Sequence, residues 1–232
     1  MLNSADNKRP IRVTFFGDSI FVGQGVSIYH GWVTRVAQSL DDYGREIGRD
    51  ILVSNASVNG RITRQALEDM PYHVQSHGVD ILVVQFGLND CNYWATDKGL
   101  PRVSLPSFAA NLREIITRGE RFGAVRVLLN NNHPTSRNKN LMAGTKITYD
   151  ESNRIYNEAT RAVARDAGSL VSFQDIEAHF NKLIDSGNTI ERFLSQDGLH
   201  LSHEGHIQYY ELMYPIVRAA INDFLAATAG SE

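Results

Sequence analysis

The chain has 232 residues, 42% of them hydrophobic and 21% charged, which is typical of a globular protein long enough for one α/β domain. A formal net charge of −3 excludes the strongly basic surface with which proteins bind nucleic acids. Because Cys91 is the single cysteine, the chain can form no internal disulfide, and a reducing compartment is expected.

The first nine residues, MLNSADNKR, are polar and contain no apolar core of a secretory signal. No apolar stretch elsewhere is long enough for a membrane helix. We therefore expect a single cytoplasmic domain over residues 1–232 that acts neither at a membrane nor on a nucleic acid. The last residues, ATAGSE, are typical of a frayed end.

Short apolar runs alternate with longer segments of helical period along the chain. The runs predict strands at 11–16, 51–56, 81–87, 125–130 and 169–173. Helices are predicted at 31–43, 62–77, 106–122, 150–167 and 175–186, followed by a last helix with the apolar stripe Ile207, Tyr210, Met213, Val217, Ile221 and Phe224. This alternation predicts a parallel sheet with helices on both faces, against which the last helix packs.

Polar segments follow the first four predicted strands. They are GDS, NASVNG, GLND and NNNHPT, in chain order. Open parallel sheets bind ligands beyond the carboxyl ends of their strands, where loops converge and helix N-termini point into a crevice. The chemistry of this protein is therefore expected at these four strand exits.

A nucleophilic serine needs a base in hydrogen-bond contact and a third group that orients the base. Ser19 follows the first strand, and the segment SQDGLHLSHEGH near the other end of the chain contains Asp197 and His200. Their spacing of three places two side chains on one side of a helical turn, and Gly198 permits a tight turn between them. The carboxylate of Asp197 can then accept Nδ1–H of His200 and leave Nε2 facing a hydroxyl.

Four segments together resemble the ordered blocks of the SGNH, or GDSL-type, hydrolase family. They are GDS at 17–19, NASVNG at 55–60, GLND at 87–90 and DGLH at 197–200. The resemblance implies a flavodoxin-like three-layer α/β fold with a five-stranded parallel sheet. It also implies a serine esterase that hydrolyses small or medium acyl esters through an acyl-enzyme, without a metal or an organic cofactor.

The same resemblance assigns roles to individual residues. Ser19 is the implied nucleophile, and Asp197 and His200 complete the triad. The backbone N–H of Ser19, the N–H of Gly60 and the side chain of Asn89 form the implied oxyanion hole. Each has a structural alternative: Ser19 and Asp197 suit helix N-caps, Gly60 a helix entry and Asn89 a turn.

Five further residues are candidate substrate contacts. Tyr93 and Trp94 lie in the long segment 91–107 after GLND. Asn132 and His133 lie where a second long segment, 133–149, begins, and a bond to a backbone carbonyl is the alternative role of His133. The aromatic pair suits an acyl group or a sugar face, although packing of the loop is an equal alternative. The second segment fits a lid or an oligomer contact. Asp18, the fifth candidate, has no implied catalytic task and is expected to bond nearby backbone N–H groups.

His203 and His206 continue the histidine spacing after His200 and resemble a metal-ligand run. A step of three residues turns successive side chains by about 60° on a helix, so three such histidines share one face poorly. We expect both at the start of the last helix, solvated or bonded to loops. Cys91 is expected to be a small packed residue.

Three other functions compete with hydrolysis of oxygen esters. An acyltransferase or a thioesterase would use the same side chains, and a ligand-binding module would have the fold without catalysis. The G-x-S-x-G elbow of the α/β-hydrolases is absent, as are the phosphate-binding G-x-G-x-x-G and G-K-[ST] patterns. The expected partner is a small acyl ester, with a homo-oligomer left open.

Overall fold

Five parallel strands form one sheet in the order β2-β1-β3-β4-β5. The computed structural model describes residues 9–229, so the expectations for the polar N-terminus and the frayed C-terminus fall largely outside it. The strands are β1 (Ile11–Phe16), β2 (Ile51–Asn55), β3 (Ile81–Gln85), β4 (Arg126–Asn130) and β5 (Val171–Gln174). This strand order is the flavodoxin-like one, which confirms the predicted fold class.

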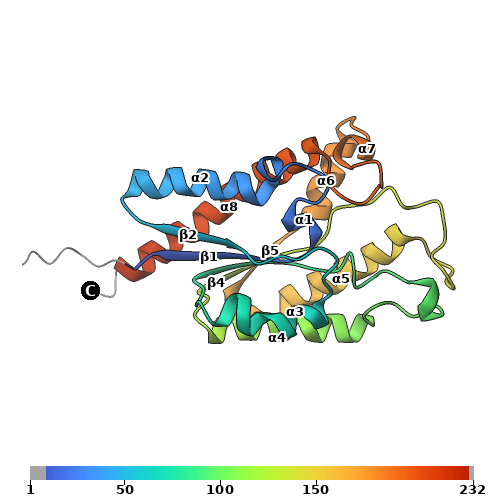
Figure 1. Ribbon diagram of the computed structural model, residues 1–232, viewed down its shortest axis with the longest axis horizontal. Coiled ribbons are helices and arrows are strands. Elements are labelled where there is room, and N and C mark those ends of the chain that lie inside the picture. Colours follow the sequence, from blue (N-terminus) through green and yellow to red (C-terminus); the bar gives the residue numbers. More distant parts are fainter. Residues whose placement is uncertain (1–8, 230–232) are drawn as a thin grey trace, which may run out of the picture.

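Two layers of helices cover the sheet (Figure 1). On one face α2 (Trp32–Ile47) packs along α8 (His203–Ala229), near α6 (Ile176–Asp185) and α7 (Ile190–Phe193). On the other face lie α3 (Thr63–Met70), α4 (Leu105–Arg121) and α5 (Tyr149–Asp166). The short elements are α1 (Ser19–Val22), η1 (Ile28–His30), η2 (Pro71–Gln75), η3 (Ala95–Asp97) and η4 (Gly168–Leu170).

The register of the sheet aligns the strand exits. Phe15 pairs with Asn55 and Val83, Gln85 pairs with Asn130, and Asn130 pairs with Gln174. The polar segments that follow β1, β2, β3 and β4 therefore leave the sheet at one edge, at the right of Figure 1. The sequence motifs meet there because parallel strands end on the same side.

The core is densest under the central strands. Every residue of β3 is buried, while β2 at the sheet edge is half exposed. Near the end of β1, the indole of Trp32 packs edge-on against Phe15 at 5.4 Å and Phe21 at 4.8 Å and stacks on Tyr209 at 4.4 Å. This aromatic cluster holds α1, α2 and α8 together directly behind the first strand exit.

Two details differ from the sequence-based expectation. The helix predicted over 62–77 is α-helical only to Met70, and a π-helical turn follows from Pro71 with Ser76 donating to the Pro71 carbonyl. Proline lacks the N–H that continues the regular ladder, so the backbone widens there. On α8 the fully buried stripe contains Tyr209, whereas the predicted stripe members Ile207 and Tyr210 are only partly buried.

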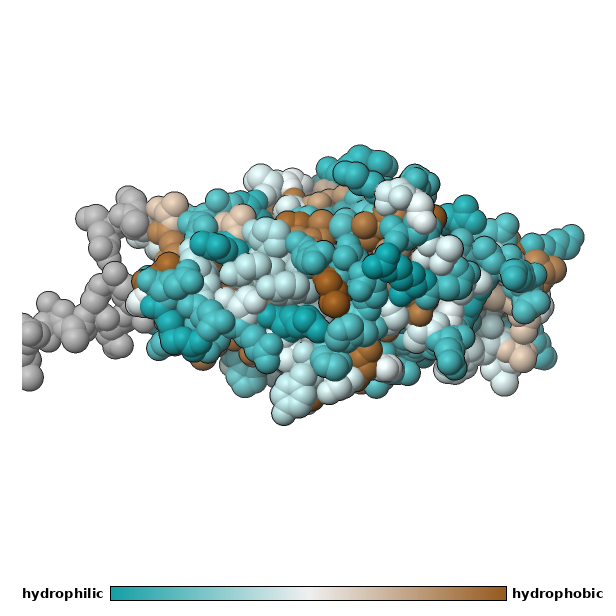
Figure 2. Space-filling view, turned by 90° about the horizontal axis from the view of Figure 1, so that it is seen from above, coloured by the Kyte–Doolittle hydropathy of each residue, from teal (hydrophilic) through white to brown (hydrophobic). Residues whose placement is uncertain are grey.

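The outer face of α2 and α8 is largely hydrophilic, with apolar residues in small separate spots (Figure 2). Within residues 9–229, no helix has both the length and the apolarity that crossing a bilayer requires.

Candidate active site

Ser19 is the first residue of α1, directly beyond β1. Asp18 caps this short helix, because its Oδ1 accepts a 3.0 Å hydrogen bond from the Ile20 amide. Gly17 allows the close passage of the chain, since a Cβ there would lie 2.9 Å from the carbonyl oxygen of Gln85 in β3. Any side chain at Gly17 would push the Ser19 turn away from the sheet edge.

The structure brings Ser19, His200 and Asp197 together in one chain of hydrogen bonds. The Nε2 atom of His200 lies 2.9 Å from Ser19 Oγ, and Nδ1 lies 2.6 Å from Asp197 Oδ2. The imidazole is mostly buried, with 12% of the side chain exposed. This is the arrangement in which an imidazole can take a proton from a hydroxyl while a carboxylate orients the ring.

Asp197 lies in a tight loop that an antiparallel bridge between Leu194 and Leu201 closes. The expectation of a helical turn here is wrong, because the loop residues have no helical conformation. The Oδ1 atom accepts hydrogen bonds from Ser195 Oγ at 2.8 Å and from the amides of Leu199 and His200 at 2.9 and 3.0 Å. Burial opposes ionisation, but these bonds and the His200 ring outweigh it and hold the pKa of Asp197 well below its usual range.

Two residues from the segment after β4 form hydrogen bonds with the backbone of this loop. Arg137 donates through Nε to the Asp197 carbonyl at 2.9 Å, and its guanidinium lies 4.0 Å from the Asp197 carboxylate. The Nε2 atom of His133 lies 2.8 Å from the Leu199 carbonyl. Burial lowers the pKa of His133 to about 4, so the ring is neutral at pH 7 and donates through Nε2–H.

The second motif, at 55–60, is fastened to the Ser19 turn by backbone contacts. The Gly17 amide donates to Ser57 Oγ at 3.0 Å, and the Val58 amide donates to the Gly17 carbonyl at 3.2 Å. Arg61 is buried under the Phe16 ring and donates to the Ala56 carbonyl at 2.7 Å. These contacts place Gly60 beside the Ser19 turn.

Gly60 itself is exposed and has the left-handed φ of +74°. A Cβ at Gly60 would meet open space, so the backbone conformation rather than packing requires glycine here. Arg102 donates through Nη1 to the Gly60 carbonyl at 3.2 Å. This hydrogen bond directs the Gly60 carbonyl toward Arg102 and restrains the backbone conformation at Gly60.

Asn89 lies in the turn that follows β3. Its Nδ2 donates to Asp18 Oδ2 at 3.4 Å, so the amide of the third motif contacts the first motif. Asp90, the next residue, accepts from the amide and hydroxyl of Thr63 at 2.9 and 2.6 Å, which ties the turn to the start of α3. Asn89 is thus held next to the Ser19 turn, as an oxyanion donor would need to be.

Asp18 fits the expected role of a loop-forming residue, since it bonds the Ile20 amide and Asn89 and is fully buried. Burial raises the pKa of Asp18 to about 7, and the nearby Asp90 acts in the same direction. The predicted contact of Asp18 with substrate stays a prediction. The burial of its carboxyl group does not favour it.

Asn132 and His133 are also fully buried, so their predicted substrate contacts gain no support. Asn132 accepts from Gln85 Nε2 at 2.9 Å and donates to the Phe86 carbonyl at 3.2 Å. A Cβ at Gly87 would collide with this amide, and the φ of +128° there is also one that side chains rarely adopt, so both the packing and the backbone require glycine. Both residues support the loops of the site from behind.

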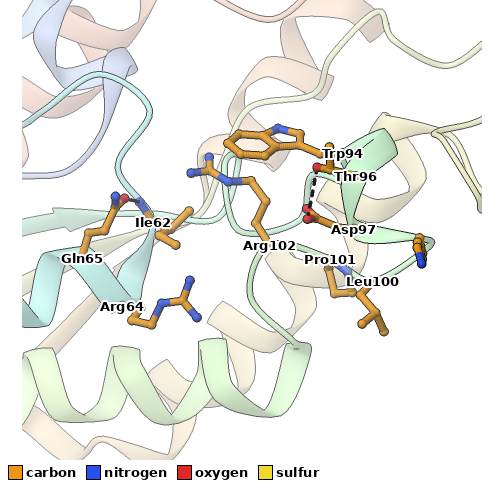
Figure 3. Close-up of a pocket in the computed structure, with 10 residues that line it drawn as sticks. Ile62, Arg64, Gln65, Trp94, Thr96, Asp97, Leu100, Pro101 and Arg102 are labelled. Carbon is orange, nitrogen blue, oxygen red and sulfur yellow. Dashed lines mark hydrogen bonds between the residues drawn. The ribbon is translucent and has the colours of Figure 1, made fainter.

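Tyr93 and Trp94 differ from each other in position. Trp94 is half exposed, and the guanidinium of Arg102 stacks on its ring at 4.2 Å. Trp94 lines a cavity of about 670 Å³ between α3 and the segment 94–102 (Figure 3). Tyr93 is partly buried and does not line this cavity. Trp94 is therefore the better placed of the two for a contact with substrate.

His203 begins α8 and packs edge-on against His30 at 4.5 Å, while the buried His206 accepts the Trp32 amide at 3.3 Å through Nδ1. Across residues 9–229, no three His, Cys, Asp or Glu side chains are grouped in a way that would hold a metal ion. Cys91 is buried, as predicted, and burial raises the pKa of its thiol.

Sequence reasoning missed the contributions of Arg102, Arg137 and Arg61. Each lies outside the four motifs and acts through a backbone carbonyl of a motif loop. A single arginine in a loop carries no sequence signal for such contacts. Only the length of the segments around Arg102 and Arg137 marked these two regions.

Comparison with known proteins shows the family of the chain. The model of the GDSL-like lipase/acylhydrolase family matches residues 15–207, which include all four motifs. The chain belongs to that family. The resemblance stated from the four motifs is thereby confirmed for this family member.

Two solved structures share the fold of this family member. An acetylxylan esterase, Axe2, from Geobacillus stearothermophilus aligns with a TM-score of 0.69 and 20% identity over 88% of this chain and 92% of that one. A lipase/acylhydrolase from Enterococcus faecalis aligns with a TM-score of 0.68 and 20% identity over 90% and 96%.

One curated relative is an arylesterase of Vibrio mimicus, 26% identical over 87 residues. The match covers 38% of this chain and 42% of the relative. The chain therefore matches about two fifths of the length of that arylesterase.

Proposed function

We propose that the protein is a serine esterase that hydrolyses carboxylic esters through an acyl-enzyme on Ser19. The observation that carries the proposal is the 2.9 Å contact between His200 Nε2 and Ser19 Oγ, with Asp197 2.6 Å from the other ring nitrogen. These three side chains come from segments about 180 residues apart, and hydrolysis explains why they converge at one sheet edge.

In the first half of the reaction, Ser19 Oγ attacks the ester carbonyl and His200 takes the hydroxyl proton on Nε2. The ionised Asp197 stabilises the resulting imidazolium and holds its Nδ1–H. The carbonyl oxygen becomes an oxyanion, which the amides of Ser19 and Gly60 and the side chain of Asn89 stabilise. His200 then gives the proton to the leaving alkoxide, and the acyl group stays on Ser19.

In the second half, His200 removes a proton from water, and the hydroxide attacks the acyl carbonyl. The same donors hold the second oxyanion until the bond to Ser19 Oγ breaks and the hydroxyl regains its proton. Every step uses only water and groups of the protein itself, so the mechanism requires no cofactor.

To stabilise the oxyanion, the Asn89 amide must donate to the substrate oxygen, either in place of its 3.4 Å hydrogen bond to Asp18 or in addition to it. The length of that bond supports this, because a long hydrogen bond holds the side chain in place without binding it tightly. Small acyl groups are the first to test, since the relatives named above include an arylesterase and an acetylxylan esterase.

The test is covalent labelling with a fluorophosphonate, combined with turnover of 4-nitrophenyl acetate and butyrate. The wild-type protein should label and release 4-nitrophenol, and the Ser19→Ala variant should do neither. Ser57→Ala is the matched control, because the Ser57 hydroxyl lies beside the site and bonds only the Gly17 amide and the Phe15 carbonyl. Labelling that persists in Ser19→Ala would end the proposal.

A further inference from the structure

The cavity beside the oxyanion loop has an unusual balance of charge. Its lining includes the cations Arg64, Lys98 and Arg102 but only one carboxylate, Asp97. The whole chain carries a formal charge of −3, so this local excess of positive charge runs against the overall balance. A concave surface with excess charge of one sign attracts ligands of the other sign.

The cations of the cavity lack the carboxylate partners that several other arginines of the protein have. Among residues 9–229, the side chains of Arg64 and Lys98 form neither a hydrogen bond nor an ion pair. Arg102 bonds the Gly60 carbonyl and stacks on Trp94, but it too has no carboxylate within ion-pair distance in that range. By contrast, Arg161 bonds both Asp175 and Glu177.

The directions of the side chains in the cavity favour one anionic group. Arg64, from α3, and Arg102, from the loop after Pro101, lie on the side of Ile62 and Gln65, and Asp97 lies across from them beside Thr96 (Figure 3). Asp97 is engaged by the Thr96 hydroxyl at 3.4 Å. Burial lowers the pKa of Arg102; the charges of Asp90 and Asp97 oppose this effect, and the like charge of Arg64 adds to it. An anion bound in the cavity would interact favourably with both guanidinium groups.

The cavity is connected to the proposed reaction centre through Arg102. Arg102 contacts the carbonyl of Gly60, whose amide is a proposed oxyanion donor, and the loop of Gly60 is bonded to the Ser19 turn through Gly17. Beside the charged residues and the polar Gln65 and Thr96, the lining contains the apolar Ile62, Trp94, Leu100 and Pro101. A short carbon frame with one terminal charge fits such a lining.

We propose that this cavity binds a second, ionised carboxylate carried by the ester substrate, with Arg64 and Arg102 as its recognition groups and Trp94 as the wall for the adjoining carbon frame. The inference rests on the proposed esterase function, because the cavity is assigned relative to Ser19. The carboxylate belongs either to the acyl part or to the alcohol part, and the two sources share the same recognition chemistry.

The experiment compares charged and neutral esters in two series. Mono-4-nitrophenyl adipate is paired with 4-nitrophenyl hexanoate for a charge on the acyl part, and 4-acetoxybenzoate with its methyl ester for a charge on the alcohol part. The measured quantity is kcat/KM of the charged ester divided by that of its neutral pair. The two esters of a pair differ in intrinsic reactivity by the same factor for every variant, so a change of the ratio between variants reports on the protein.

The main variant is Arg64→Gln, because Arg64 contacts none of the proposed catalytic groups. The ratio should fall about three- to fivefold in one of the two series, the size expected for an exposed ion pair, and the wild-type ratio should itself fall with added salt. Arg121→Gln is the matched control: it removes the same charge at the end of α4, away from the cavity. Its ratio should equal that of the wild type.

Equal ratios in the wild type and Arg64→Gln for both series would overturn the inference, as would an equal fall in Arg121→Gln. The proposed function fails separately, if Ser19→Ala still hydrolyses the neutral esters. Calorimetric binding of 4-acetoxybenzoate and of adipate to the Ser19→Ala variant gives a readout without turnover. Weaker binding of either anion after the added Arg64→Gln exchange supports the cavity as its site, and unchanged binding of both rejects it.

Discussion

His133 donates a 2.8 Å hydrogen bond to the carbonyl of Leu199, the residue directly before His200. The ring is fully buried and packs 5.8 Å from Phe180, which itself contacts Phe193 just before the loop of Asp197. His133, a candidate substrate contact in the sequence, therefore has the alternative role of bonding a backbone carbonyl, and it supports the loop that carries the proposed base His200.

We expect His133→Ala to lower kcat for 4-nitrophenyl acetate about 10- to 100-fold, because small displacements of a catalytic base are costly. Removing a buried ring also destabilises the fold, so the comparison is made with His133→Gln, which retains a donor for the Leu199 carbonyl. Partial rescue of kcat by Gln, with a similar melting temperature for both variants, supports positioning. Equal kcat in both variants would show that only packing matters.

Asn89→Ala should lower kcat by about 10²–10³, the loss found when one side-chain donor is removed from an oxyanion hole. The KM should change little, since the donor acts mainly in the transition state. Steady-state kinetics with 4-nitrophenyl acetate measures both constants. The control is Asn92→Ala, a nearby amide that bonds within its own loop. Nearly full turnover in Asn89→Ala would remove Asn89 from the mechanism.

Asp197→Asn should lower kcat by on the order of 10³–10⁴, as the equivalent exchange does in serine proteases. The amide oxygen can still accept from Ser195 and Leu199, so the loop should keep its shape. The depressed pKa of Asp197 keeps the carboxylate ionised at all pH values from 5 to 9 in the wild type. Circular dichroism checks the fold, and an activity loss below tenfold would contradict the orienting role.

Asp18 should make stability depend on pH in a direction unusual for an aspartate. Burial raises the pKa of Asp18 to about 7 in the folded state, above its value of about 3.9 in an unfolded chain. A raised pKa favours the folded state at low pH, and this contribution is lost as the pH rises toward and through 7. The loss approaches about 1.4 kcal/mol per pH unit between the two pKa values.

The measurement is urea unfolding of the wild type and Asp18→Asn at pH 5, 6, 7 and 8. Asn retains the cap of α1 but does not titrate in this range. The free energy of unfolding of Asp18→Asn minus that of the wild type should therefore increase from pH 5 to pH 8. A difference that stays constant over this range would show that Asp18 does not titrate as the burial of its carboxyl suggests.

Much of the fold could be predicted because buried parallel strands leave a clear pattern. The runs at β1 and β3 are almost wholly apolar, since both faces of the central strands are covered. Helix ends were harder to place: α3 ends at Met70 where Pro71 changes the hydrogen-bond ladder, and no periodicity marks that change in advance. The spacing of Asp197 and His200 suits a helical turn, but it suits equally a non-helical loop closed by the bridge between Leu194 and Leu201.

The sequence by itself determined the order of the polar segments after the strands, the family, and Ser19, Asp197 and His200 as candidates for the triad, because these depend on local patterns along the chain. Only the tertiary structure decided what surrounds them. Buried polar side chains such as Asn132, His133 and Asp18 resemble ligand contacts in the sequence, but in the fold they satisfy backbone groups of the loops. Arg102 and Arg64 show the converse, since they lie 38 positions apart along the chain and line one cavity only in the folded structure. Hydrogen bonds and ion pairs form between groups a few ångströms apart in space, and the number of residues between two groups along the chain does not determine that distance.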